Sequence, residues 1–318
     1  RHARKRVDRS PMLRPARWTL EAAVMAGLWG LSASLSPERA SAAGRRLLQR
    51  LGPSLKNTTH LRRNLGLAFP DRSAPELDRL VRQVWGQMGA VLAEYPHLGA
   101  ICAGEGGHRV RTVIRFDLER LRRQNRPAIF VTAHLANWEI AAAVGARADL
   151  PLTVVYTPIE NPWIDRRLYR YRQALGCKMI AREDALRPLM GELAAGRSVG
   201  LLMDQRTDSG APIPFFGIEK LTTLVPARLA LRFDCDLIPV RVERLQGVRF
   251  RVTAFEPVSA GAEDRTEQER AMAMTRQVHA LFESWIKEAP EAWFCSNRRW
   301  PKKAQPPRAA LVQAAPAH

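Results

Sequence analysis

Between residues 127 and 242 the chain alternates short apolar runs with stretches of helical periodicity. The apolar runs have the length of strands and lie at 127–133, 152–156, 177–181, 198–204 and 236–242. Helical patterns at 139–147, 161–175 and 183–195 separate most of them. Such alternation is typical of an α/β domain, in which helices cover the faces of a sheet. We therefore predict a mixed, largely parallel central sheet flanked by helices.

Two features predict irregular positions in the sheet. Residues 248–255 alternate with period two, which is typical of a half-exposed antiparallel strand. Pro239 lies inside the 236–242 run. Because proline has no N–H to donate to a strand ladder, we expect this strand at a sheet edge or at a bulge.

The pattern before residue 106 is helical throughout. Ser73 and Glu76 have the spacing of a capping box, and a stripe of apolar residues with helical period follows them. The boundaries predicted from these changes are a basic, flexible N-terminus at 1–17, a helical region at 18–105, an α/β domain at 106–300 and a disordered tail at 301–318.

Residues 18–35 are almost uncharged and follow directly on the basic N-terminus. A spanning helix needs about 20 apolar residues, and this stretch approaches that length but contains Glu21, Ser32 and Ser34. Basic residues before an apolar stretch are the arrangement that holds a helix at an anionic leaflet. We expect a membrane-inserted or interfacial anchor here, with a buried amphipathic helix as the alternative.

The charge of the chain predicts anionic partners. Lys and Arg number 50 against 31 acidic residues, which gives a formal net charge of +19. Nucleic acid and phosphate-bearing lipid both fit this balance, and charge alone does not choose between them. The four cysteines are scattered without a CxxC pair, so we expect reduced thiols and neither a metal site nor a disulfide framework.

His134 and Glu139 stand where the first apolar run gives way to a helix. Within one continuous helix they would be turned about 140° from each other and could not touch. If His134 lies in the turn that ends the strand, Glu139 can fold back and hold one imidazole nitrogen while the other faces a pocket. A carboxylate orients a histidine general base in this way. A capped helix start with a satisfied histidine is the structural alternative.

Further polar residues end two later strands. Arg182 follows the 177–181 run, and Asp204, Gln205 and Arg206 stand where the 198–204 run ends. Ligands of open α/β sheets bind beyond the carboxyl ends of the strands, so we expect these side chains to share a crevice with the histidine. Guanidinium groups in that crevice suit phosphate.

Four blocks, in this order, resemble the H-x4-D/E motifs of glycerolipid acyltransferases: HLANWE, GCKMIAR, DQRTDSG and LIPV. A finer resemblance, to the bacterial lipid A biosynthesis (late, or lauroyl/myristoyl) acyltransferases, rests on HLRRNLGLAFPD, WGQMGAVLAEYPHL, VVYTPIENPWID, LLMDQRTDSGAPIPFFG and PEAWFCSNRRW. It spans roughly residues 20–300. Two departures bear on the choice of acceptor or chain length: SNRRW stands where many relatives have a histidine before the arginines, and GAPIPFFG varies the usual apolar pair before PFFG.

The resemblance implies an enzyme at the cytoplasmic face of the inner membrane. Such an enzyme moves a fatty acyl chain from acyl carrier protein onto a hydroxyl of a lipid A precursor. By resemblance His134 is the general base, Glu139 orients it, and the hydroxyl attacks the thioester directly. Neither a cofactor nor a metal is expected, because one histidine with distant carboxylates is a poor ligand set.

The other motif residues are assigned to substrate binding by the same resemblance: Arg182, Asp204, Gln205, Arg206, Asn137, Asn161 and Asp165. Arg182 and Arg206 are candidates for a phosphate of the acceptor or of phosphopantetheine, and Asp204 and Gln205 for shaping the pocket. A helix N-cap fits Asn161 equally well.

Three other functions compete with this one. The motifs recognise generic parts of the reaction, so a lysophospholipid, an ornithine lipid or a mannosylated phosphoinositide is an alternative acceptor. A membrane-tethered nucleic-acid-binding protein would need stacking aromatics among its arginines or a known binding fold, and the sequence has neither. An inactive membrane scaffold is disfavoured by the intact His134–Glu139 pair.

Overall fold

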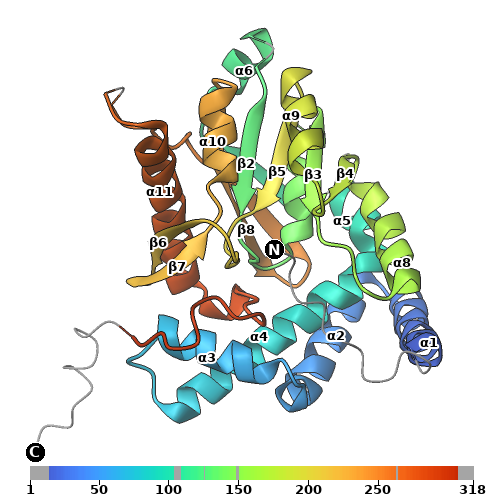
Figure 1. The fold of residues 1–318 in the computed structure, drawn as a ribbon. Coiled ribbons are helices and arrows are strands. Elements are labelled where there is room, and N and C mark those ends of the chain that lie inside the picture. Colours follow the sequence, from blue (N-terminus) through green and yellow to red (C-terminus); the bar gives the residue numbers. More distant parts are fainter. Residues whose placement is uncertain (1–13, 104–108, 125, 148–149, 263, 307–318) are drawn as a thin grey trace, which may run out of the picture.

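The computed structural model describes residues 14–103, 109–124, 126–147, 150–262 and 264–306 (Figure 1). Within these ranges the centre of the molecule is a seven-stranded sheet of order β1-β9-β8-β2-β5-β3-β4. Its strands are β1 (Val110–Ile114), β2 (Ala128–Thr132), β3 (Leu152–Tyr156), β4 (Lys178–Ala181), β5 (Ser198–Leu202), β8 (Asp236–Gln246) and β9 (Arg249–Ala254). All neighbours are parallel except β8 and β9. The predicted mixed, largely parallel sheet is confirmed.

A hairpin of β6 (Ala211–Phe215) and β7 (Ile218–Thr222) forms a separate small sheet. The helices are α1 (Arg14–Ala33), α2 (Pro37–Leu51), α3 (Thr58–Ala68), α4 (Ala74–Glu94), α5 (Leu98–Cys102), α6 (Leu118–Gln124), α7 (Ala142–Arg147), α8 (Pro162–Arg172), α9 (Leu186–Ala194), α10 (Val225–Arg232) and α11 (Glu267–Glu288). In Figure 1, α2, α3 and α4 lie below the sheet, at the end toward which β2 runs.

Strand β2 is buried along its whole length and contributes side chains to two separate hydrophobic cores. Because successive side chains of a strand point to opposite faces, Ile129 and Val131 join one core with residues of α9, α10 and α11. Phe130, on the opposite face, joins a second core that includes residues of α1, α5 and α8. A strand buried on both faces explains the nearly continuous apolar run at 127–133 in the sequence.

The antiparallel strand predicted at 248–255 is confirmed as β9, although its position between β1 and β8 buries more of it than expected. The edge or bulge predicted for Pro239 is wrong, since β8 is an interior strand between β9 and β2 and its register shift lies at Arg244 and Gln246. The carbonyl of Pro239 accepts a hydrogen bond from Phe255, just beyond the last residue of β9. The nitrogen and the carbonyl of a strand residue point to the same side, so the nitrogen of Pro239 also faces the chain beyond the end of β9. The N–H that proline lacks therefore removes no hydrogen bond between β8 and β9.

The first helices confirm one local prediction and leave others open. Ser73 and Glu76 form the expected capping box at the start of α4. The apolar stretch predicted as an anchor lies mostly in α1, and no helix within the described ranges is both long and apolar enough to cross a bilayer. Of the flexible N-terminus predicted at 1–17 and the tail predicted at 301–318, residues 1–13 and 307–318 fall outside the described residues, whereas residues 14–17 already belong to α1. The predicted division into domains remains a prediction.

Candidate active site

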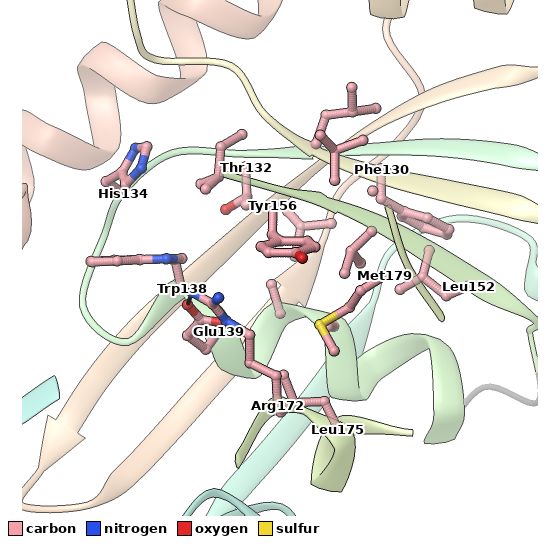
Figure 2. Close-up of a pocket in the computed structure, with 18 of the residues that line it drawn as sticks. Phe130, Thr132, His134, Trp138, Glu139, Leu152, Tyr156, Arg172, Leu175 and Met179 are labelled. Carbon is pink, nitrogen blue, oxygen red and sulfur yellow. Dashed lines mark hydrogen bonds and ion pairs between the residues drawn. The ribbon is translucent and has the colours of Figure 1, made fainter. Parts of the chain in front are cut away.

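A cavity of about 440 Å³ lies along one face of the central sheet (Figure 2). Residues that are paired between neighbouring strands lie side by side there. Because successive side chains of a strand point to opposite faces, every second residue of each strand faces the cavity. One row across the sheet consists of Phe130, Gly200, Val154 and Met179. Most of the lining is apolar, and polar side chains gather near the carboxyl ends of the parallel strands.

His134 lies in the turn directly after β2, at this polar end of the cavity. The turn is fixed by Ala136, whose φ is 50°, and by a hydrogen bond from the N–H of Phe294 to the carbonyl of His134. The imidazole Nδ1 lies 2.6 Å from Oδ1 of Asp204, and Nε2 lies 3.2 Å from Nε2 of Gln205. The ring of Trp138 packs edge-on against the imidazole, with the ring centroids 5.0 Å apart.

An ionised Asp204 can only accept, so Nδ1 of His134 is the donor in this contact. Gln205 turns its amide nitrogen toward Nε2 of His134, and its Oε1 accepts a long hydrogen bond of 3.5 Å from Arg182. The arrangement holds Nδ1 of His134 against Asp204 and turns Nε2 toward Gln205 at the cavity.

Asp204 is fully buried and is held on every side by donors. Its Oδ2 accepts hydrogen bonds of 3.0 Å from the indole of Trp293 and from the guanidinium of Arg299. Lys220 donates to its backbone carbonyl at 2.6 Å. Burial alone would raise the pKa of Asp204, but His134 and Arg299 outweigh that effect and hold this pKa well below its usual value. The side chain is therefore an anion.

Glu139 does not take the position expected for it. It lies in the 3₁₀ turn η4 (Trp138–Ala141), where its carboxylate accepts hydrogen bonds of 2.7 and 2.9 Å from Arg172 and 2.8 Å from the hydroxyl of Tyr95. The turn brings Trp138 against the His134 ring instead, as Figure 2 shows. The contact predicted between Glu139 and a ring nitrogen of His134 is thus corrected: Asp204 makes it.

The Glu139–Arg172 pair lies at the cavity wall, where the side chain of Glu139 is 9% and that of Arg172 13% exposed. Burial opposes the charge of Arg172, but Tyr95 and Glu139 more than offset it, so the pKa of Arg172 is raised. Burial likewise raises the pKa of the Tyr95 phenol. Both residues were missed in the sequence, where Arg172 looked like one of several surface arginines of a helix.

The structure brings together only some of the predicted site residues. Those that line the cavity are His134, Glu139, Arg182 and Gln205, with Asp204 directly behind the histidine. The other predicted residues lie outside the lining and hold neighbouring segments: Arg206 pairs with Asp208, Asn137 donates to Glu94, Asn161 caps α8, and Asp165 accepts from the N–H of Ile159. For Asn161 the N-cap alternative is the one observed.

Trp293 and Arg299 were also missed as functional residues. Both stand in PEAWFCSNRRW, so the block was recognised but not its contact. They reach Asp204 across 89 and 95 residues of sequence, a distance over which no local pattern predicts pairing. Among the described residues no cluster of three or more His, Cys, Asp or Glu side chains could hold a metal ion.

Comparison with known proteins assigns the chain to a group of related enzymes. A family model described as bacterial lipid A biosynthesis acyltransferase matches residues 8–302. The lipid A biosynthesis palmitoleoyltransferase of Escherichia coli (strain K12) is 27% identical over 261 residues, which cover 78% of this chain and 80% of the relative. The phosphatidylinositol mannoside acyltransferase of Mycolicibacterium smegmatis is 24% identical over 245 residues, or 76% and 78% of the two chains. The lipid A biosynthesis myristoyltransferase of E. coli (strain K12) is 26% identical over 203 residues, or 61% and 60%.

Proposed function

Because the chain belongs to the bacterial lipid A biosynthesis acyltransferase family, we propose that it moves a fatty acyl chain from acyl carrier protein to a hydroxyl of a lipid A precursor. Membership in the family makes the chain an enzyme that transfers acyl groups; the donor, the acceptor and the residue roles are the proposal. One observation carries it. His134, backed by the buried carboxylate of Asp204, lies in the lining of a mostly apolar cavity.

In the proposed reaction His134 acts as general base. Its Nε2 takes the proton of the acceptor hydroxyl while the hydroxyl oxygen attacks the thioester carbonyl carbon. Collapse of the tetrahedral intermediate breaks the carbon–sulfur bond, and the imidazolium returns the proton to the departing thiolate. Asp204 keeps Nδ1 protonated and stabilises the imidazolium. The products are an ester and a free thiol, and no acyl-enzyme forms.

Gln205 has two tasks in this scheme. Its amide N–H occupies the position at Nε2 of His134 where the acceptor hydroxyl must bind, so it has to move when the acceptor enters. Once displaced, the same N–H can donate to the oxygen of the thioester, on which negative charge develops. Glu139 and Arg172 act differently, as a rigid pair that shapes the wall beside the histidine.

The apolar part of the cavity fits the fatty acyl chain of the donor. The row of Phe130, Val154 and Met179 presents only hydrocarbon and thioether surface to it. Burial of each methylene contributes about 0.8 kcal/mol, so a long chain gains much of its affinity from this surface. Arg182 lies exposed at the polar end, where it can meet a phosphate of either substrate.

We also assign the membrane contact to α1, with the protein on the cytoplasmic face of the inner membrane. Trp29 and Ser32 of α1 face the protein, whereas Leu20, Val24, Leu28 and Leu31 are 67, 53, 43 and 64% exposed. Exposed Arg14 and Arg17 precede this apolar surface. A helix with apolar exposed side chains and basic residues at one end lies in the headgroup region of an anionic membrane.

A second acceptor class is supported by one observation. The similarity to a phosphatidylinositol mannoside acyltransferase covers nearly as much of the chain as the similarity to a lipid A enzyme. A mannosylated phosphoinositide or a lysophospholipid would use the same base and the same cavity. This alternative changes the acceptor and leaves the chemistry as described.

Acyl transfer in detergent micelles tests the proposal. Acyl carrier protein thioesters of several lengths are offered with a tetraacyl lipid A precursor that carries its Kdo sugars, or with a lysophospholipid. We expect transfer to the lipid A precursor, and a loss of at least about 100-fold in kcat for His134→Ala. The exposed His60 provides the matched control, since His60→Ala should keep full activity.

The outcomes separate the alternatives. Transfer to the lysophospholipid alone would replace the acceptor and keep the mechanism. Undiminished transfer by His134→Ala would remove His134 from the chemistry altogether.

A further inference from the structure

We propose that Gly200 sets the length of the acyl chain that the cavity accepts. This inference rests on the proposed function, because it takes the cavity to be the place where the acyl chain of the donor lies. Gly200 belongs to β5, in the middle of the cavity floor, and is one of the residues that line it. The sequence motifs described above do not include Gly200.

The strand register places Gly200 between two large side chains. It pairs with Phe130 of β2 on one side and with Val154 of β3 on the other. Met179 of β4 continues the same row beyond Val154. Each of these three neighbours presents a side chain to the cavity, whereas Gly200 presents none. The row therefore has a gap at its centre, and the gap forms a trough along the floor.

The backbone gives no reason for a glycine at this position. Gly200 is not among the glycines with a positive φ, so any L-residue can adopt its conformation. Glycine within a strand weakens the strand and often marks a place where a ligand approaches the backbone closely. A Cβ at Gly200 would lie 3.7 Å from Cδ1 of Leu152 and 3.1 Å from Cγ1 of Val154, so the Val154 side chain would have to shift by a few tenths of an ångström to admit it. Both of these residues line the cavity, so a side chain at position 200 would project into it.

The position of the row along the strands gives Gly200 its role in chain length. The reacting end of the acyl chain is at His134, and Thr132 is the first β2 residue of the cavity floor on the way inward. Phe130 and Gly200 follow two residues further along, a distance of about 7 Å at about 3.3 Å per residue. Figure 2 shows His134 on one side of the group of lining residues and Phe130 and Leu152 on the other. A chain must cross the trough at Gly200 to reach Leu152.

A side chain at position 200 would therefore shorten the usable cavity without touching His134. Each methylene kept out of the cavity lowers donor binding about fourfold, the equivalent of about 0.8 kcal/mol. Binding of donors with long acyl chains should therefore weaken, whereas binding of donors with short acyl chains should not. A smaller side chain in place of Phe130, which borders the trough, should have the opposite effect and favour longer acyl chains.

A competition between donors tests this inference. The full-length protein in detergent micelles receives an equimolar mixture of acyl carrier protein thioesters of increasing length, with the acceptor that supports transfer. Mass spectrometry then gives the ratio of long-chain to short-chain product. For Gly200→Val we expect this ratio to fall at least tenfold below that of the parent protein, and for Gly200→Ala by a smaller factor. For Phe130→Leu the ratio should rise. The matched control is Gly191→Ala on the exposed side of α9, where a Cβ meets nothing within 4 Å and the ratio should not change.

The remaining outcomes are equally definite. If Gly200→Val fails to fold, Gly200→Ala and Phe130→Leu still shift the ratio in opposite directions. An unchanged ratio in these variants, or an equal loss of transfer for every donor length, would overturn the inference while the proposed function stands. A parent protein that transfers no acyl chain from any donor would overturn both.

Discussion

At the scale of single residues, two buried carboxylates lie on different sides of His134 and have different partners. Asp204 contacts the imidazole and is neutralised by Arg299, whereas Glu139 is neutralised by Arg172 and contacts Tyr95. A buried charge is tolerated only when it is paired and hydrogen-bonded. Each carboxylate therefore has its own arginine, and the two pairs can be tested separately.

Glu139→Ala should act on stability. The variant leaves the guanidinium of Arg172 buried without its carboxylate, which typically costs about 3 kcal/mol of unfolding free energy or more. Denaturant unfolding measures the loss. Glu119 pairs with Arg122 at the surface, so Glu119→Ala should change the unfolding free energy by no more than about 1 kcal/mol. Full stability of Glu139→Ala, together with lost acyl transfer, would instead return Glu139 to the role of orienting His134.

Lys220 should make stability depend on pH. Burial lowers the pKa of this fully buried ammonium to about 7. In the unfolded chain the pKa is about 10.4, so between these values the unfolded state binds a proton that the folded state does not. The unfolding free energy therefore rises with pH across this window, by up to about 1.4 kcal/mol per pH unit.

Comparison with Lys220→Met isolates this contribution, since other titrating groups cancel in the difference. The unfolding free energy of the parent protein relative to Lys220→Met should increase from about pH 7 to about pH 9. The exposed Lys303 serves as control, and Lys303→Met should run parallel to the parent protein. Parallel curves for Lys220→Met would show that the buried amine titrates normally.

The residues of the site differ in how far a sequence can predict them. His134, Gln205 and Arg182 were predicted to share a crevice because parallel strands end at one edge of a sheet, and they do line one cavity. The partner of the histidine was not predicted correctly, because it depends on the conformation of one turn. The φ of 50° at Ala136 and the 3₁₀ start at Trp138 leave no trace in the residue pattern.

At the scale of elements, helices α2 and α4 pack against each other at two glycines, Gly44 and Gly89. A Cβ at Gly89 would collide with the carbonyl oxygen of Gly44, and a Cβ at Gly44 with that of Gly89. The two backbones thus lie in direct contact, which only glycine permits. Periodicity predicted that the stripe on α4 is a packing surface, but it could not identify the helix that packs there, since that depends on shape.

Gly89→Ala should therefore destabilise the protein, although alanine is the better helix former by about 1 kcal/mol. Overpacking at the helix contact should cost about 1–3 kcal/mol and lower the melting temperature. Gly191→Ala in α9 is the matched control, because open space surrounds this position and the usual gain for alanine should appear. Equal stabilisation by both variants would mean that α2 and α4 separate easily.

The exposed apolar surface of α1 predicts membrane binding. Leu31→Glu places a charge on this surface and should reduce the fraction bound to vesicles containing phosphatidylglycerol at least tenfold. The reason is that burial of one leucine side chain contributes roughly 1.5–3 kcal/mol to binding. Leu245→Glu, at another exposed position near the end of β8, should bind as the parent protein does. Equal binding of both variants in a flotation assay would separate α1 from the membrane.

At the scale of the whole molecule, segments from both ends of the described chain meet behind the active site. Asn64 of α3 donates to the carbonyls of Cys295 and Asn297 and accepts from the N–H of Arg299. Arg299 and Trp293 in turn hold Asp204. The orientation of His134 thus depends on contacts between residues more than 200 positions apart. The α/β class followed from local periodicity, whereas this closure depends on tertiary packing that no window of the sequence contains.

The central claim is that Asp204, and not Glu139, activates His134 for acyl transfer. It is tested most directly by the kcat of Asp204→Asn beside that of Asp234→Asn, an equivalent change at an exposed aspartate. We predict a fall on the order of 10³-fold for Asp204→Asn and none for Asp234→Asn, because an amide does not stabilise the imidazolium as a carboxylate does. Acyl transfer by Asp204→Asn at the rate of the parent protein would contradict this account.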